Sequence, residues 1–394
     1  MINLPQGWKW KNLGEICFIT DGTHKTPNYI ETGIPFLSVK NISKGFFDLS
    51  DVKYISLEEH NKLIKRAKPE FGDILICRIG TLGKAIKISL EFEFSIFVSL
   101  GLLKPKVKII SDYLVYFLNS CFIEEWINDN KVGGGTHTAK LNLNILEKCP
   151  IALPPLKEQE RIVGILDESF AKIDESIKIL EQDLLNLDEL MQSALQKAFN
   201  PLKDNAKENY KLPQGWEWKS LEEISENISA GGDKPKNCTE SKTAKNQIPV
   251  YANGVNNNGL VGYTDKATII KPSLTISARG TIGFVCIRKE PYFPIVRLIS
   301  LIPCENILCL HYLYFCLNFF IAKGEGSSIP QLTIPKFKSL QIPLPPLKEQ
   351  EQIASHLDEL SSHVKNLKQN YQAQIKDLQE LKKSLLDKAF KGNL

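Results

Sequence analysis

The sequence has few of the features that mark a secreted protein or a metalloprotein. Its nine cysteines are odd in number, form no Cys-x-x-Cys pair and lie mostly among apolar neighbours. We therefore expect reduced thiols rather than disulfides or a zinc site. The six histidines have no spacing typical of metal ligands, so we expect no metal bound by this chain.

No apolar run is long enough to cross a bilayer. The longest, Leu308 to Ala322, is interrupted by His311 and Asn318, and it is shorter than the roughly 20 residues that a spanning helix needs. The first ten residues, MINLPQGWKW, lack the apolar segment of a signal peptide. These absences predict a cytoplasmic protein.

Motifs for nucleotide or methyl-transfer chemistry are also missing. Lys84 follows a glycine turn, but Ala85 comes next and Arg78 occupies the place of the upstream glycine, so this is not a P-loop. The two Leu-Pro-Pro-Leu segments lack the acidic or amide residue, Pro, Pro, aromatic pattern of amino-methyltransferases. We expect a chain with no catalytic site and no cofactor of its own.

Two long amphipathic segments, Leu153 to Phe199 and Leu344 to Phe390, dominate what is present. Each begins with a Pro-Pro pair, contains no later proline and carries apolar residues at alternating spacings of three and four. This pattern predicts two uninterrupted helices, each roughly 65 Å long at about 1.5 Å per residue, that pair as a coiled coil. The expected seam contains Leu166, Ile173, Ile177, Leu180, Leu184, Leu187, Leu357, Leu360, Val364, Leu367, Tyr371, Gln374, Leu378, Leu381 and Leu385.

The chain repeats itself. LPPLKEQERI at 153–162 recurs as LPPLKEQEQI at 344–353, LPQGWKW at 4–10 recurs as LPQGWEW at 212–218, and GTLG at 80–83 recurs as GTIG at 280–283. We therefore expect a first module at residues 1–155, a long helix at 156–200, a linker at 201–211, a second module at 212–346 and a second long helix at 347–394. Because domain termini usually lie close together, the helices should run antiparallel.

Each module reads as α+β. Short β-rich runs broken by Gly, Asn and Pro turns are followed by an aromatic-rich helix. The β-rich runs include residues 73–79, 85–88 and 268–277, and the helices are expected near 113–127 and 310–322. Residues 38–70 of the first module hardly resemble residues 251–268 of the second. The motifs that flank these segments repeat, whereas the segments themselves do not.

Charge separates the helices from the modules. Residues 156–199 carry five basic and ten acidic side chains, a net charge of −5, and residues 347–391 carry eight basic and seven acidic ones, a net charge of +1. The whole chain has a net charge of +4, so about +8 lies on the rest. The positive field therefore belongs to the modules.

Candidate ligand-contacting residues lie in the glycine turns and polar loops of both modules. Lysine, arginine, asparagine and hydroxyl side chains at such places can contact phosphates or base edges, although solvated turns that need glycine for positive φ have the same composition. The candidates are Lys25, Thr26, Lys40, Asn41, Arg78, Thr81, Lys84, Thr136, His137, Lys140, Lys234, Asn253, Asn256, Asn257, Arg279, Thr281, Ser327, Ser328 and Gln331.

With LPxGW opening each module, a GTxG turn in each and LPPLxEQ introducing each long helix, the chain closely resembles the DNA-specificity subunits of type I restriction-modification systems. The resemblance covers essentially the whole length. It implies two target recognition domains with an approximate two-fold relation, each reading one half of a split, asymmetric site in double-stranded DNA. It also implies that the helices set the separation of the half-sites and dock two modification subunits.

The same resemblance implies that the chemistry belongs to partner subunits. Methylation would reside in the modification subunits and cleavage in the restriction subunits, which use S-adenosylmethionine, ATP and Mg. Two other interpretations stay open. A two-headed adaptor that binds polypeptides would explain the coiled coil equally well, but not the positive charge of the modules. A self-contained enzyme is the third.

Overall fold

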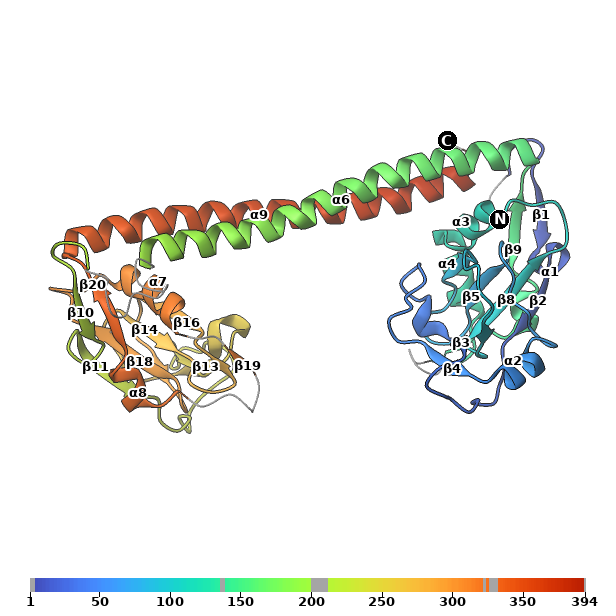
Figure 1. Cartoon of the computed structure of the whole chain (residues 1–394). Coiled ribbons are helices and arrows are strands. Elements are labelled where there is room, and N and C mark those ends of the chain that lie inside the picture. The colour runs from blue at the N-terminus through green and yellow to red at the C-terminus, as the bar shows by residue number, and fades with distance from the viewer. Residues whose placement is uncertain (1–3, 135–138, 200–211, 322–323, 326–331, 393–394) are drawn as a thin grey trace. The chain divides into compact units, whose positions relative to one another are not determined.

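The computed structural model describes residues 4–134, 139–199, 212–321, 324–325 and 332–392. It forms two compact units, residues 1–180 with 373–394 and residues 181–372 (Figure 1). Each unit contains one module and one end of each long helix, α6 (Leu156–Phe199) and α9 (Leu347–Phe390). Within the described ranges, no helix is both long and apolar enough to span a bilayer.

Module 1, which precedes α6, is built around a four-stranded antiparallel sheet in the order β2-β8-β5-β6. A three-stranded sheet, β4-β3-β7, packs nearby, and β1 pairs with β9 at the module's entry and exit. The strands are β1 (Lys9–Asn12), β2 (Cys17–Asp21), β3 (Ile34–Leu37), β4 (Lys53–Ile55), β5 (Ile74–Cys77), β6 (Ala85–Lys87), β7 (Ser95–Ile96), β8 (Leu100–Pro105) and β9 (Pro150–Leu153). The helices are α1 (Leu13–Ile16), η1 (Val39–Asn41), α2 (Leu57–Leu63), α3 (Ser111–Leu118), α4 (Cys121–Asn130) and α5 (Leu143–Leu146).

Module 2, which precedes α9, repeats this topology. Its four-stranded sheet has the order β11-β18-β14-β16, its three-stranded sheet the order β13-β12-β17, and β10 pairs with β20. The strands are β10 (Glu217–Ser220), β11 (Ser225–Ala230), β12 (Ile248–Tyr251), β13 (Leu260–Thr264), β14 (Ser273–Ile276), β15 (Thr281–Ile282), β16 (Val285–Arg288), β17 (Phe293–Pro294), β18 (Ile299–Pro303), β19 (Gly324–Glu325) and β20 (Gln341–Leu344). The helices are η2 (Asn256–Gly259), α7 (Leu310–Phe320) and α8 (Ile334–Lys338). The predicted α+β repeat is confirmed.

One predicted helix is broken. Residues 113–127 form two helices, α3 and α4, instead of one. The break lies at Asn119, whose side-chain amide donates a hydrogen bond to the backbone oxygen of Ala85 (2.8 Å) and accepts one from the backbone nitrogen of the same residue (3.1 Å). The side chain thereby ties the end of α3 to strand β6. Asparagine favours such ends because its amide competes with helix hydrogen bonds.

The recurring LPPLxEQ motif has a structural cause in both modules. The Gln159 amide is buried, donates to the backbone oxygen of Pro154 and accepts from the backbone nitrogen of Ile110, both at 2.9 Å. Gln350 makes the equivalent bonds in module 2 at 2.8 and 2.9 Å. These bonds satisfy backbone groups that would otherwise be buried without partners. They also fix the start of each long helix to its own module.

The end of each long helix completes the core of the opposite module. Phe390, at the end of α9, packs on Tyr113 and Phe117 of α3 with ring centroids 5.7 and 4.9 Å apart. Phe199, at the end of α6, packs on Tyr312 of α7 at 5.5 Å. Both helices end in the sequence Lys-Ala-Phe. The repeated ending is therefore explained by two equivalent aromatic contacts.

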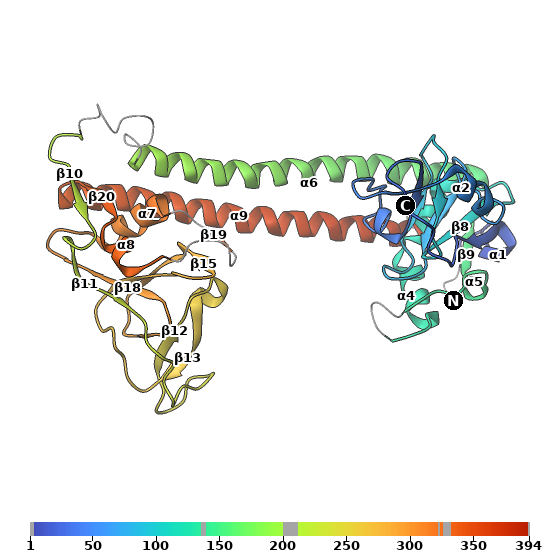
Figure 2. The same cartoon turned by 60° about the horizontal axis from the view of Figure 1, so that its bottom comes forward.

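The two long helices are antiparallel in each unit (Figure 1; Figure 2). In unit 1 the start of α6 shares a core with Phe390, and the later residue Asp174 pairs with the earlier residue Lys382 at 2.6 Å. In unit 2, Asp188 pairs with Lys368, while the end of α6 shares a core with the start of α9. The predicted antiparallel coiled coil is confirmed.

Most of the expected seam is buried or half-buried, with a local exception in α9. Leu367 is 40% exposed and Leu381 is 45% exposed, so both lie outside the packed stripe. After Tyr371 the next half-buried position is Ile375, whereas the heptad pattern predicted Gln374. Seven residues further on, Lys382 is half-buried where the pattern predicted Leu381, and its ammonium lies 4.9 Å from the centroid of the Phe170 ring. A snorkelling lysine thus occupies a position that the heptad pattern assigned to leucine.

We predict that Phe390→Ala destabilises module 1 rather than module 2. Truncating a buried phenylalanine typically lowers the free energy of unfolding by about 3–5 kcal/mol. Hydrogen exchange should show faster amide exchange in residues 111–118, and the matched variant Phe199→Ala should act instead on residues 310–320. Increased exchange in the same module for both variants would contradict the crossed arrangement.

Candidate nucleic-acid interface

The GTxG turns have the same backbone geometry in both modules. Gly80 and Gly83 have φ values of 80° and 81°, and Gly280 and Gly283 have 77° and 80°. Such positive φ angles favour glycine. The backbone nitrogen of Gly83 donates to the backbone oxygen of Cys77 at 2.9 Å, and the backbone nitrogen of Gly283 donates to the backbone oxygen of Ser277 at 3.0 Å. Each turn comes shortly after an inner strand of its four-stranded sheet, β5 in module 1 and β14 in module 2.

The least similar segments of the two modules lie beside these turns. In module 2 the β12–β13 connection is tied to the end of β14, because the Asn253 side chain accepts from the backbone nitrogen of Ala278 at 3.0 Å. The backbone nitrogen of Gly254 donates to the Ser277 hydroxyl at 3.3 Å. In module 1, residues 44–47 of the β3–β4 connection line one groove with Lys84, the residue directly after the turn. We call the GTxG turn together with this connection the variable surface of each module.

A groove of about 830 Å³ adjoins the variable surface of module 1. It is lined by residues of the β3–β4 connection, strand β6, helix α3 and the unit 1 ends of α6 and α9. Its wall includes Phe46, which is 57% exposed, and several lysines. Lys44 and Lys87 pair with aspartates at 2.6 Å, whereas Lys84 and Lys383 form no ion pair within the described ranges. The groove therefore presents positive charge beside an aromatic ring.

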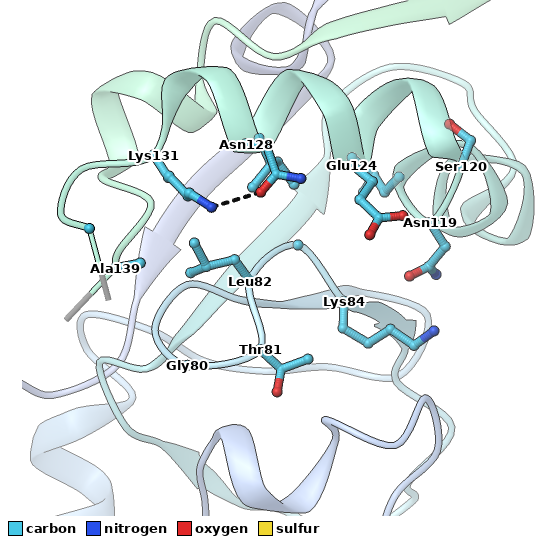
Figure 3. A pocket seen from close by; sticks show the side chains of 14 residues that line it. Gly80, Thr81, Leu82, Lys84, Asn119, Ser120, Glu124, Asn128, Lys131 and Ala139 are labelled. Atoms are coloured by element: carbon cyan, nitrogen blue, oxygen red, sulfur yellow. Dashed lines mark hydrogen bonds between the residues drawn. The ribbon is translucent and has the colours of Figure 1, made fainter. Parts of the chain in front are cut away.

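A second cavity, of about 400 Å³, lies between the GTLG turn and α4 (Figure 3). The Leu82 side chain points toward α4, and Thr81 points away from it. Lys131, the residue directly after α4, donates to the Asn128 side chain at 2.8 Å. Because the Thr81 side chain points away from α4, it lies on the outer side of the GTLG turn. No three His, Cys, Asp or Glu side chains converge as a metal-binding group in the part of the chain that the structure describes.

Arg78 is structural rather than phosphate-facing. It is 7% exposed, its guanidinium pairs with Asp21, and its Nε donates to the backbone oxygen of Leu141 at 2.9 Å. Burial opposes ionisation of Asp21, but hydrogen bonds and charges from Arg66 and Arg78 outweigh it and hold the Asp21 pKa below its ordinary value. The prediction that Arg78 faces phosphate therefore lacks support.

The two arginines near the turns are not equivalent. Counting from the shared glycines, Arg78 corresponds to Ala278, and Arg279 corresponds to Ile79. Arg279 is exposed. Only the second module therefore presents an arginine from this turn to solvent.

Two lysines occupy equivalent places at the ends of the first strands of the four-stranded sheets. The glycines before them, Gly22 and Gly231, pass so close to a neighbouring strand that a β-carbon on either would collide with its backbone. Beyond these crossings the chain runs parallel to the neighbouring segment through isolated bridges. Lys25 and Lys234 follow, and both are exposed.

The remaining candidates divide by exposure. Exposed side chains are Lys25, Thr26, Lys40, Thr81, Lys140, Lys234, Asn256, Asn257 and Arg279, and half-buried ones are Lys84, Asn253 and Thr281. Asn41 is buried and accepts from the backbone nitrogen of Ser38 at 2.9 Å, so it organises the β3–β4 connection. Thr136, His137, Ser327, Ser328 and Gln331 lie outside the described residues.

Sequence reasoning missed several residues of the variable surfaces and of the groove that adjoins module 1's surface. Phe46 and Lys383 line the groove of module 1, and Asn258 extends the asparagine turn of module 2. An exposed aromatic residue in the glycine-flanked segment KGFF was the available signal for Phe46. Lys383 gave none, because it lies on α9, which comes beside module 1 only through tertiary packing.

We predict that Asp21→Asn destabilises unit 1, because it leaves Arg78 buried without its counter-ion. Breaking a buried pair from one side typically costs about 3–5 kcal/mol. The lowered Asp21 pKa means that this stabilisation is present above the ordinary aspartate pKa of about 3.9 and is lost as pH falls through the lower folded-state value. Urea unfolding followed at pH 7 and pH 3 should therefore show a smaller difference between wild type and variant in acid.

The exposed Arg279→Ala serves as the control, with an expected change within about 0.5 kcal/mol. Equal unfolding midpoints for wild type and Asp21→Asn at pH 7 would contradict the assignment.

The chain matches a known family over most of its length. The family model Methylase_S, described as the type I restriction modification DNA specificity domain, matches residues 5–184 and 213–377. A Mycoplasma pneumoniae protein named as a type I specificity subunit is 31% identical over 270 residues, covering 68% of this chain and 69% of that protein. The EcoKI specificity subunit of Escherichia coli is 23% identical over 99% of this chain and 90% of its own length.

Solved structures show the same fold. A chain from a structural study of type I restriction-modification complex assembly aligns over 100% of both chains with a TM-score of 0.82 and 22% identity. The HsdS subunit of Thermoanaerobacter tengcongensis aligns over 100% of this chain and 98% of its own, with a TM-score of 0.60 and 22% identity. With both halves matched by the family model, this chain belongs to the DNA-specificity subunits of type I restriction-modification systems.

Proposed function

We propose that the two variable surfaces each read one half of a bipartite, asymmetric DNA site. The observation that carries this proposal is the contrast between a repeated frame and unlike surfaces. Module 1 presents Lys40, Lys44 and Phe46 where module 2 presents Asn256 and Asn257. Side chains with different donors and acceptors discriminate between different base edges.

Within each module, charged and amide side chains take different roles. Lys25, Lys234 and Arg279 are exposed cations, which suits phosphate contacts that set orientation without reading sequence. The asparagines carry both a donor and an acceptor on one planar group, which suits base edges. Binding should therefore combine a salt-dependent, sequence-independent part with a sequence-dependent part.

The long helices serve this function as a spacer and docking element. Each runs without a break from one compact unit into the other, so its length constrains the separation of the half-sites. Two modification subunits would dock on the helices, and restriction subunits would join them. Methylation and cleavage, with S-adenosylmethionine, ATP and Mg, would belong to these partners, in the cytoplasm where the DNA lies.

The proposal predicts sequence-specific methylation that depends on this chain. DNA from cells that express the chain with its modification subunit should carry methylation at one bipartite motif. Cells that express the modification subunit alone should lack it. Methylation without a shared motif would contradict sequence reading by this chain.

Arg279→Ala should weaken DNA binding by the assembled complex about uniformly across sequences. Loss of one phosphate contact reduces the slope of log affinity against log salt by about 1. Binding titrations at several salt concentrations measure this slope, and Lys289→Ala, another exposed cation of module 2, is the control. Salt-insensitive binding of a polypeptide instead would favour the adaptor interpretation.

Helix length should set the spacer between the half-sites. A four-residue insertion near Leu184 in α6 alone should break the seam register and impair assembly. Matched insertions near Leu184 and Gln372 should restore pairing and lengthen the spacer in the methylated motif. An unchanged spacer in the matched variant would refute the role of the helices as a ruler.

A further inference from the structure

The interior under the variable surface is apolar in module 1 and polar in module 2. Strand residues alternate between the two faces of a sheet. One face of each four-stranded sheet packs on the aromatic helix in both modules, with Ile74 and Ile76 in module 1 and Leu274 and Ile276 in module 2. The opposite face in module 1 is covered by an apolar cluster that includes Leu75, Ile88, Phe94 and Leu102. The corresponding residues of module 2 are Thr275, Arg288, Tyr292 and Ser300, all buried.

Arg288 is the charged member of this polar interior. It is 8% exposed, its Nε donates to the Thr275 hydroxyl at 3.0 Å, and its guanidinium carbon lies 3.5 Å from the centroid of the Tyr251 ring. No aspartate or glutamate in the described ranges lies within ion-pair distance of it. A buried cation without a counter-ion is destabilising compared with the isoleucine that module 1 uses. The stability of module 2 therefore does not explain why an arginine, rather than an apolar residue, occupies position 288.

Arg288 also reaches the variable surface, through one of its terminal nitrogens. Its terminal nitrogen donates to the backbone oxygen of Asn258 at 2.6 Å. Asn258 belongs to the β12–β13 connection, and Ala252 closes this connection by donating to the backbone oxygen of Gly259 at 2.8 Å. The buried arginine thus supports the turn from below.

The supported turn has an unusual backbone. Asn257 and Asn258 have φ values of 47° and 52°, and they are the only residues other than glycine with positive φ in the described part of the chain. Asparagine tolerates this conformation better than most residues, but glycine adopts it without strain. Both side chains are exposed. Two consecutive asparagines, rather than glycines, therefore retain side-chain amides at a place where the backbone alone favours none.

We infer, on the basis of the proposed function, that Asn257 and Asn258 are the base-reading residues of module 2 and that Arg288 is their positioning residue. An asparagine amide matches the N6 donor and N7 acceptor of adenine in the major groove. The expected target is an A·T base pair in the half-site read by module 2. Module 1 has isoleucine in place of Arg288 and a longer connection with lysines and Phe46, so it reads a different half-site by other contacts.

The test uses Asn257→Gly and Asn258→Gly in the chain assembled with its modification subunits. Glycine adopts the same backbone conformation without strain, so each variant removes the amide while retaining the turn. Competition binding against duplexes randomised at both half-sites should show that preference for an A·T pair falls about tenfold or more in one half-site only. Preference in the other half-site, and affinity for unrelated duplex, should stay unchanged.

Arg288→Met tests the positioning role. It replaces the charge with an apolar side chain of similar length, in keeping with the isoleucine of module 1. We expect the same loss of preference at the same base pair, with unchanged hydrogen exchange in α7, and no further loss when it is combined with Asn257→Gly. Additive losses would overturn the positioning role, because they would show that the two residues act independently.

Asn306→Gly provides the matched control. Asn306 is an exposed turn residue beyond the Pro303 end of β18, whereas the variable surface adjoins the other end of that strand, and its substitution should leave every preference unchanged. If the wild-type complex discriminates between bases and both asparagine variants retain that discrimination, the base-reading assignment is wrong. If the wild-type complex has no sequence preference, the proposed function itself fails and the inference fails with it.

Discussion

The rest of the structure depends on the pairing of two helices that cannot stand alone. A 44-residue helix with a narrow apolar stripe leaves that stripe in water unless another helix covers it. Antiparallel pairing solves this in each unit and brings Phe390 and Phe199 into the aromatic cores of the two modules. Each module therefore depends on a residue from the far end of the opposite helix. The helices are as much part of the modules as they are a connection between them.

In each module, one face of the four-stranded sheet packs on residues of the same type in both modules, whereas the residues on the other face differ between the modules. The face toward α3 and α7 keeps apolar residues in both modules, and the buried glutamines of the LPPLxEQ motifs make the same backbone bonds. The other face supports the β3–β4 or β12–β13 connection, and here even the interior changes, from Ile88 to Arg288. Variation thus extends below the surface, because a turn of different shape needs different support.

The variable surfaces also show how one frame can carry different recognition chemistry. The GTxG turn keeps its backbone geometry in both modules because glycine is required at positive φ. Around it, module 1 places lysines and an exposed phenylalanine, while module 2 places asparagines and Arg279. The backbone conformation of the turn is the same in both modules, whereas the side chains beside it differ.

Much of the architecture could be predicted from the sequence because it rests on periodic or repeated patterns. The three-four spacing of apolar residues predicts the long helices, and the duplicated motifs predict two modules of one topology. Single steps in such patterns are less certain. The stripe of α9 contains Ile375 and Lys382 instead of Gln374 and Leu381. Both pairs are seven residues apart, so only packing against α6, such as the contact of Lys382 with Phe170, decides between them. The break at Asn119 depends on a hydrogen bond to a strand that lies far away in the sequence.

The candidate site was less predictable, because the direction of a side chain at a turn depends on its tertiary neighbours. Arg78 and Arg279 look alike beside their glycines, yet Asp21 draws the first inward while the second is exposed. Residue type alone indicated cations and amides near the turns. Only the tertiary structure decided which of them are exposed, which stabilise the frame, and that a buried arginine supports the asparagine turn, since these outcomes depend on contacts between strands that are distant in the chain.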